Sequence, residues 1–251
     1  MGDTTSSTAT LEGTPAGSFA SRLLGVFIEP GTTFEDIARK PGWLSPLIVL
    51  VLVSFATVET MLMKIGASQI AMQSIQQSGR AQNVDPAQLN QIAQRTAGIL
   101  RVAMPAFALV GVPIFLLIVA GFGLLALNIF FGKQAKFKDV FSVTCFANLP
   151  AILGGLMAIA VVLFGDDDAF NVKNPAPDNL GFFMNPLTSS HAIYALATSL
   201  NFIIFWFLAL LAIGLSRVVR KEVKAGSIFL VYLGAWVLVV AAKVGLAVMF
   251  S

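Results

Sequence analysis

Two ionisable residues, Glu59 and Lys243, stand inside long apolar stretches of the sequence. A charged side chain in membrane hydrocarbon is costly, so such residues are functional candidates by default. Glu59 lies 16 residues after Trp43, and Lys243 lies 17 residues after Gly226. At 1.5 Å per helical residue, both fall about 24–26 Å from the side on which their segments begin. The shared depth leaves three roles open: an ion pair between them, separate contacts of each with the outer interface, or an ion pathway.

Two asparagines and three prolines are the other unusual residues of the apolar stretches. Asn148 and Asn201 fall near the middle of theirs, where an interhelical hydrogen bond is worth about 0.6–2 kcal/mol. Structural hydrogen bonding fits these asparagines better than substrate binding. Pro105, Pro113 and Pro150 predict helix kinks, because proline frees a backbone carbonyl. Interrupted helices can line a transporter site, although prolines are ordinary in membrane spans.

The sequence offers no recognisable catalytic or metal-binding set. One histidine and one cysteine cannot supply the usual ligands of a zinc site. The run Asp166-Asp167-Asp168 lacks the alternating ligand spacing and the glycine of a calcium loop. Phosphate-cradling glycine loops and the HExxH and GxSxG motifs are also missing. We therefore expect no enzyme activity, no metal and no cofactor.

The composition indicates which solvent surrounds these residues. Of 251 residues, 57% are hydrophobic and 12% are charged, against about 25% charged in a soluble domain. A helix needs about 20 mostly apolar residues to cross a membrane. Five segments qualify, so the sequence predicts an all-α integral membrane protein, a five-transmembrane-helix bundle. The predicted spans are residues 44–63, 104–131, 140–164, 192–215 and 227–250.

The basic residues predict the orientation of this bundle. Ten lie in the N-terminal region and in the second and fourth loops, against five in the first and third loops. Basic residues remain on the cytoplasmic side, so we expect a cytoplasmic N-terminus and an extracytoplasmic C-terminus. The same rule explains the net charge of +3 without a nucleic-acid partner. The basic residues expected to face a cytoplasmic partner or lipid are Arg22, Arg39, Lys40, Lys133, Lys136, Lys138, Arg217, Arg220 and Lys221.

Outside the spans, the sequence predicts a tail, short helices and a hairpin. Residues 1–18 are poor in apolar side chains and predict a disordered tail before a single membrane domain, residues 19–251. Residues 18–28 have one apolar face, which fits a helix on the membrane surface or one packed under the bundle. Thr32–Glu35 resembles a capping box that opens a short helix. The long first loop, with Asp85-Pro86 as a helix start, predicts an extracytoplasmic helical hairpin.

Several of these segments together resemble prokaryotic members of the Ypt-interacting protein (Yip) domain family. The resemblance is carried by Val26–Pro30, Thr33–Ala38 and Pro41–Leu47, and by Gly132–Val140 followed by Asn148–Pro150. It implies a five-span bundle with a cytoplasmic N-terminus, in agreement with the charge count. Eukaryotic members of the family are linked to Rab GTPases, vesicle transport and membrane shaping. Their Asp-Leu-Tyr-Gly-Pro signature is missing here, which argues against carrying GTPase binding over.

Two functions fit these observations. The first is a non-enzymatic scaffold or adaptor in membrane organisation or trafficking-like processes, in a prokaryotic plasma (inner) membrane. Its partners would be membrane lipids, with other membrane proteins or a second copy of the chain as further candidates. The alternative is a small transporter or channel that uses Glu59 and Lys243.

Overall fold

The computed structural model describes residues 18–78, 84–165 and 170–249, and these ranges contain helices and irregular segments but no strand. The predicted tail falls outside the described residues, except for Ser18, which caps the first helix. The predicted all-α class is confirmed for the described chain. In order, the helices are α1 (Phe19–Ile28), α2 (Pro30–Arg39), α3 (Leu44–Lys64), α4 (Ala67–Gln76), α5 (Pro86–Leu125), η1 (Ala126–Phe130), α6 (Phe137–Ala147), α7 (Ala151–Phe164), η2 (Leu180–Phe183), α8 (His191–Ser199), α9 (Phe202–Val218) and α10 (Ala225–Met249).

Four helical stretches of the described chain are long and apolar enough to cross a membrane. They are Leu44–Lys64, Pro86–Phe130, Phe137–Phe164 and Ala225–Met249, and each contains one of the predicted spans or nearly all of it. Several such stretches make the chain a multi-pass membrane protein.

The remaining predicted span, residues 192–215, is not one continuous helix. α8 ends at Ser199 and α9 begins at Phe202, and the 17 residues of α9 extend about 26 Å. Asn201 separates them: its side-chain oxygen accepts from the Ile204 amide at 3.0 Å and caps α9. The Phe202 amide donates to the carbonyl of Asp178 at 3.0 Å. A distant loop therefore interrupts a stretch that is apolar enough to continue.

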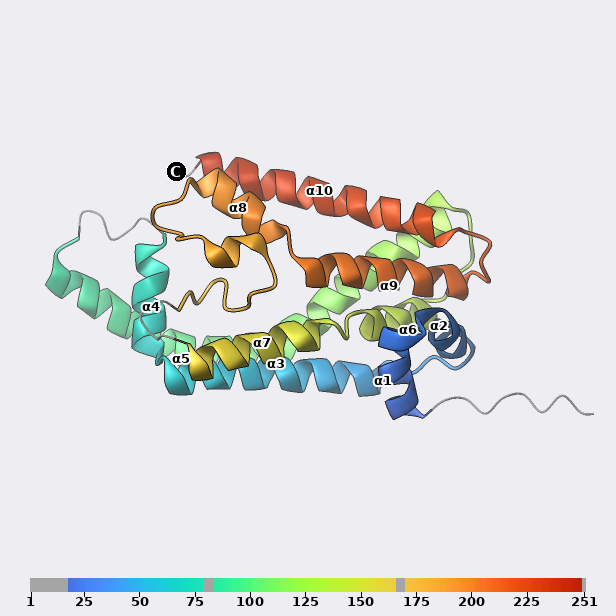
Figure 1. Cartoon of the computed structure of the whole chain (residues 1–251), viewed down its shortest axis with the longest axis horizontal. Helices are drawn as coiled ribbons and strands as arrows, with labels where there is room; N and C mark the ends of the chain where they lie inside the picture. The colour runs from blue at the N-terminus through green and yellow to red at the C-terminus, as the bar shows by residue number, and fades with distance from the viewer. Residues whose placement is uncertain (1–17, 79–83, 166–169, 250–251) are drawn as a thin grey trace, which may run out of the picture.

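The three prolines have different consequences. Pro105 and Pro113 lie inside α5, which continues through both residues, although its two ends point in different directions in Figure 1. Pro150 lies in a hydrogen-bonded turn that divides the stretch Phe137–Phe164, because α6 ends at Ala147 and α7 begins at Ala151.

The first loop forms a helix that packs against the start of α5. Gly66 has φ +87°, a conformation that favours glycine, and turns the chain between α3 and α4. α4 then packs on α5 through buried alanines, among them Ala71 and Ala97. As predicted, the Asp85 carboxylate caps α5 by accepting from the Ala87 amide at 2.7 Å. α4 is therefore separated from α3 at Gly66, whereas α5 runs without a break from this loop into the second candidate span.

The start of α2 corrects the predicted capping box. The hydroxyls of Thr32 and Thr33 donate to the carbonyl of Glu29, at 3.1 and 2.9 Å, so neither acts as a capping acceptor for the helix amides. The helix begins earlier, at Pro30, whose fixed φ suits the first helical position. It ends at Arg39, two residues before Pro41-Gly42.

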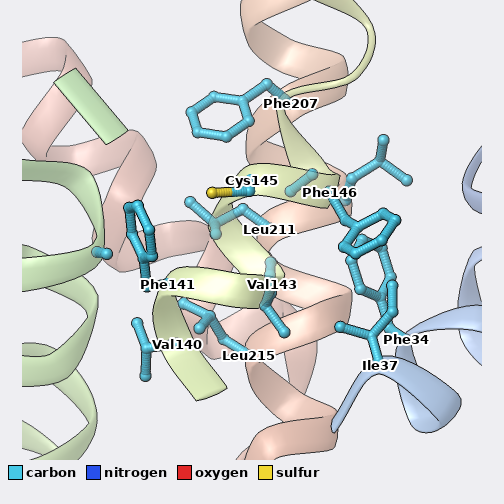
Figure 2. Close-up of a cluster of buried hydrophobic side chains, with 14 of the residues drawn as sticks. Phe34, Ile37, Val140, Phe141, Val143, Cys145, Phe146, Phe207, Leu211 and Leu215 are labelled. Atoms are coloured by element: carbon cyan, nitrogen blue, oxygen red, sulfur yellow. The ribbon is translucent and has the colours of Figure 1, made fainter. Parts of the chain in front are cut away.

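The core surrounds α6, in which every residue from Val140 to Ala147 is buried. α6 packs against α9 and α2, which also contact each other, and Phe34 and Ile37 of α2 lie beside it (Figure 2). Both side chains are fully buried. A Cβ on Gly214 of α9 would stand 2.8 Å from the Phe34 ring, so this glycine lets α2 approach closely. With Val26 of α1 also fully buried, the residue 18–28 helix packs under the bundle, one of its two predicted alternatives.

Figure 1 shows an elongated molecule with different ends. α1 and α2, hereafter the N-terminal pair, lie at one end with the turn between α9 and α10. α4, α8 and the C-terminal end of α10 lie at the other. We call these the α2 end and the α4 end.

Candidate functional site

The N-terminal pair is closed by an ion pair. Arg22 of α1 donates from Nε to the Asp36 carboxylate of α2 at 2.7 Å. Its Nη1 donates to the Lys40 carbonyl at 3.0 Å, at the point where α2 ends. The arginine therefore fixes both the angle between the two helices and the exit of the chain toward α3.

Glu35 connects this pair to the turn after α9. Its Oε1 lies 2.8 Å from Lys221 Nζ and 3.5 Å from Arg217 Nε; the second is an ion pair without a hydrogen bond. The hydrogen bond from Lys221 lowers the pKa of Glu35 below its ordinary value, helped by the positive charges of Lys221 and Arg217. Arg220 and Lys221 have φ of 51° and 64°, which is uncommon for residues other than glycine. Glu35 thus holds an unusual turn in place.

A further ion pair joins two loops at the same end. Lys133, between α5 and α6, lies 2.9 Å from Glu222, between α9 and α10. The hydrogen bond from Lys133 lowers the pKa of Glu222. The N-terminal region and the second and fourth loops, which the charge count grouped together, are therefore neighbours in space.

The other loops meet at the α4 end through neutral groups. Gln77, the residue after α4, donates to the side-chain oxygen of Asn171 at 3.1 Å, and Asn171 donates to the Tyr194 hydroxyl of α8 at 2.7 Å. Asn174 and Asn179 exchange two side-chain hydrogen bonds, at 3.0 and 2.7 Å, and both are buried. We call these five residues the amide network. Sequence reasoning missed it, because that loop was interpreted only through its aspartates; the recurrence of asparagine there was the available signal.

Glu59 and Lys243 are not brought together. α3 and α10 lie on opposite sides of the molecule in Figure 1, and among the described residues no ion pair joins the two side chains. Lys243 Nζ instead donates to the hydroxyls of Thr198 and Ser199, at 2.9 and 3.0 Å. These residues form the last turn of α8, where exposed carbonyls favour a positive charge. Of the three roles left open for these residues, the structure does not show the ion pair, and Lys243 bonds to α8 instead.

Asn148 and Asn201 do not form an interhelical bridge with one another. Asn148 directly follows the last residue of α6, as its C-cap, and Asn201 caps the start of α9. Asn201 also forms an isolated antiparallel bridge with Asn179, which connects the amide network to the helix interruption. Both asparagines therefore stand at helix ends, where a short polar side chain is favoured.

The nine predicted surface basic residues divide into two groups. Arg22, Lys133, Arg217 and Lys221 are engaged in the ion pairs described above. The other five are exposed and form no ion pair within the described chain; they are Arg39, Lys40, Lys136, Lys138 and Arg220. The first group holds the α2 end together, and the second remains accessible to a ligand.

Comparison with known proteins identifies the family. No curated protein and no solved structure matches this chain. Residues 24–244 match the Yip1 domain, a match that begins within α1, covers α2 to α9 and ends within α10. The segments that suggested the resemblance from the sequence lie inside this match. The chain therefore belongs to the Yip1 domain family.

Proposed function

We propose that this protein is a non-enzymatic membrane scaffold or adaptor, with the N-terminal pair as its cytoplasmic docking surface. The observation that carries the proposal is the rigid attachment of this pair. Val26, Phe34 and Ile37 are fully buried, and Glu35 is bonded to the turn after α9. A surface held by both apolar packing and ion pairs is preorganised, which reduces the entropic cost of binding a partner.

The proposed topology has five crossings, a cytoplasmic N-terminus and an extracytoplasmic C-terminus and α4–α5 hairpin, in a prokaryotic plasma membrane. The contacts between loops support an odd number of crossings. Lys133 and Glu222 place the second and fourth loops at the α2 end, whereas Gln77 and Asn171 place the first and third loops at the α4 end. The α8–α9 segment runs between these ends, so its two helices together would make the remaining crossing. The exposed basic residues of the α2 end support its cytoplasmic placement.

Site-specific photocrosslinking tests the docking surface. Leu24 and Ile28 of α1 are 59% and 75% exposed, so a crosslinker at either position reaches a neighbour without disturbing the core. We expect it to capture a distinct protein in native membranes. A crosslinker at Phe183, 77% exposed at the α4 end, is the control. Capture of lipid alone from α1, or of the same proteins from both ends, would contradict the proposal.

The second candidate is a small transporter or channel. The interruptions after Ala147 and Ser199 favour it, since interrupted helices can line solute sites. The carboxylate of Asp178 also lies near the α7 backbone, with its Oδ2 3.4 Å from where a Cβ on Gly154 would stand. This candidate predicts solute flux in liposomes that Glu59→Gln abolishes without unfolding. Equal flux in the variant and the parent would exclude a role for Glu59.

A further inference from the structure

The exposed lysines of the α2 end gather beside a group of aromatic rings. Phe137, the first residue of α6, stacks on Phe141, with ring centroids 5.6 Å apart. Trp43, just before α3, also contacts Phe141, with centroids 5.5 Å apart. One buried ring therefore joins two segments that are far apart in the sequence, and it brings their neighbouring lysines to one corner of the molecule.

This corner is both cationic and apolar at its surface. Trp43 is 36% exposed and Phe137 is 41% exposed, although Phe141 beneath them is only 6% exposed. Lys40 precedes Trp43 by three residues, and Lys136 and Lys138 flank Phe137. We call Lys40, Trp43, Lys136, Phe137 and Lys138 the lysine–aromatic corner.

The ion pairs of the α2 end leave the corner's charge uncompensated. Glu35, Asp36 and Glu222 are each engaged by a basic residue outside the corner. Asp139 follows Lys138 in the first turn of α6, where the helix dipole favours a carboxylate. With this one carboxylate against three lysines, the corner keeps a net positive charge.

We propose that the lysine–aromatic corner binds the headgroup of an anionic phospholipid of the cytoplasmic leaflet. Lysines near a membrane surface attract anionic lipids, and aromatic rings such as those of Trp43 and Phe137 favour the level of the headgroups. The charge complementarity and the exposed rings favour a lipid over a soluble anion, which would gain nothing from the rings. The leaflet assignment rests on the proposed cytoplasmic placement of the α2 end.

Lipid retention by the purified full-length protein in detergent tests this site. Native mass spectrometry would count bound phosphatidylglycerol and phosphatidylcholine of the same chain length, added in equal amounts. We expect the parent to prefer phosphatidylglycerol by about ten-fold or more, since each lysine at a membrane surface contributes substantially to anionic lipid binding. The variant K40Q/K136Q/K138Q should lose this preference, and K40R/K136R/K138R should keep it.

The matched control is R95Q/R101Q/K173Q, which removes three exposed positive charges from the first and third loops. It should retain the preference. Equal loss in the control would mean that net charge alone attracts the lipid, and an unchanged preference in K40Q/K136Q/K138Q would remove the site; either result overturns the inference. If K40Q/K136Q/K138Q unfolds, K40R/K136R/K138R and K138Q test the site in its place. Loss of the phosphatidylglycerol preference in the arginine variant would then overturn the inference. The lipid measurement uses no protein partner, so its outcome is independent of photocrosslinking from Leu24. The lipid site can fail while the docking surface is supported, and the docking surface can fail while the lipid site is supported.

Discussion

The two ends of this bundle are closed by different chemistry. At the α2 end, apolar side chains of the N-terminal pair enter the core and carboxylates pair with arginine or lysine, as in Arg22–Asp36. At the α4 end, neutral amides bond to one another, as in Asn174–Asn179, and charged groups bond to neutral ones, as Asp178 does to Asn179 and Lys243 to Thr198. Ion pairs near water are weakened by salt and acid, whereas neutral hydrogen bonds do not titrate. Because its carboxylates are paired with arginine or lysine, the α2 end should respond more strongly to salt and acid than the α4 end.

The largest effect should come from emptying the core at the α2 end. Phe34 is fully buried against α6 and α9, so Phe34→Ala removes a ring and leaves a cavity. We expect a loss of about 3–5 kcal/mol in the free energy of unfolding, measured by denaturation in detergent. Phe183→Ala, at a side chain 77% exposed, is the control and should change little. A loss below about 1 kcal/mol for Phe34→Ala would mean that the N-terminal pair is only loosely attached.

A smaller loss should follow when one amide of the α4 end is removed. Asn179→Leu leaves the buried side chain of Asn174 without its two hydrogen bonds, and an unsatisfied buried group costs about 1–3 kcal/mol. The double variant N174L/N179L should lose less than the sum of the single variants, because neither partner is then orphaned. Strict additivity in this double-mutant cycle would show that the two amides do not stabilise one another.

The two ends also differ in how far the sequence predicted them. Apolar runs marked the position of α3 and α10 almost to the residue, since twenty apolar residues have few alternatives to a helix in lipid. The count of basic residues grouped the N-terminal region with the second and fourth loops. The ion pairs Lys133–Glu222 and Glu35–Lys221 join these same segments in the structure. The placement of basic residues on one side of a membrane depends on whole loops, so it can be predicted from the sequence without the tertiary structure.

The sequence was uninformative where a contact depends on distant residues. The interruption at Asn201 needs the backbone of Asp178, and no local pattern contains that partner. Equal depth suggested a Glu59–Lys243 pair, but depth gives only one coordinate of a side chain in a bundle. The other two coordinates are set by the rotation and packing of α3 and α10. That packing depends on glycine contacts and aromatic rings between helices.

The lysine at the α4 end should matter less than the buried amides. Lys243→Met keeps the length of the side chain and removes two hydrogen bonds to the last turn of α8. Hydrogen bonds between membrane helices average about 0.6 kcal/mol, so we expect a loss of about 1 kcal/mol in the free energy of unfolding. Lys243→Arg should restore most of it. If Lys243→Met is more stable than the parent, desolvation of the ammonium outweighs its hydrogen bonds.

The smallest expected change in stability comes from removing the Glu35 carboxylate, and its dependence on pH distinguishes the α2 end from the α4 end. Glu35 has a lowered pKa because Lys221 donates to its carboxylate, so its contribution is present above the ordinary carboxyl pKa. It is lost as the pH falls through the lowered pKa, when the protonated side chain no longer attracts Lys221 and Arg217. Because the pair is partly exposed, Glu35→Gln should cost only about 0.2–1 kcal/mol at neutral pH.

Hydrogen exchange localises this effect better than global unfolding does. Amides of α2 should exchange faster in acid than at neutral pH, after correction for intrinsic exchange rates, while those of α4, which has no titratable side chain, should change little. In Glu35→Gln the acid response of α2 should shrink, because the titrating carboxylate is gone. An equal acid response at both ends would show that general loosening of the bundle, and not the ion pairs of the α2 end, controls the opening of the N-terminal pair.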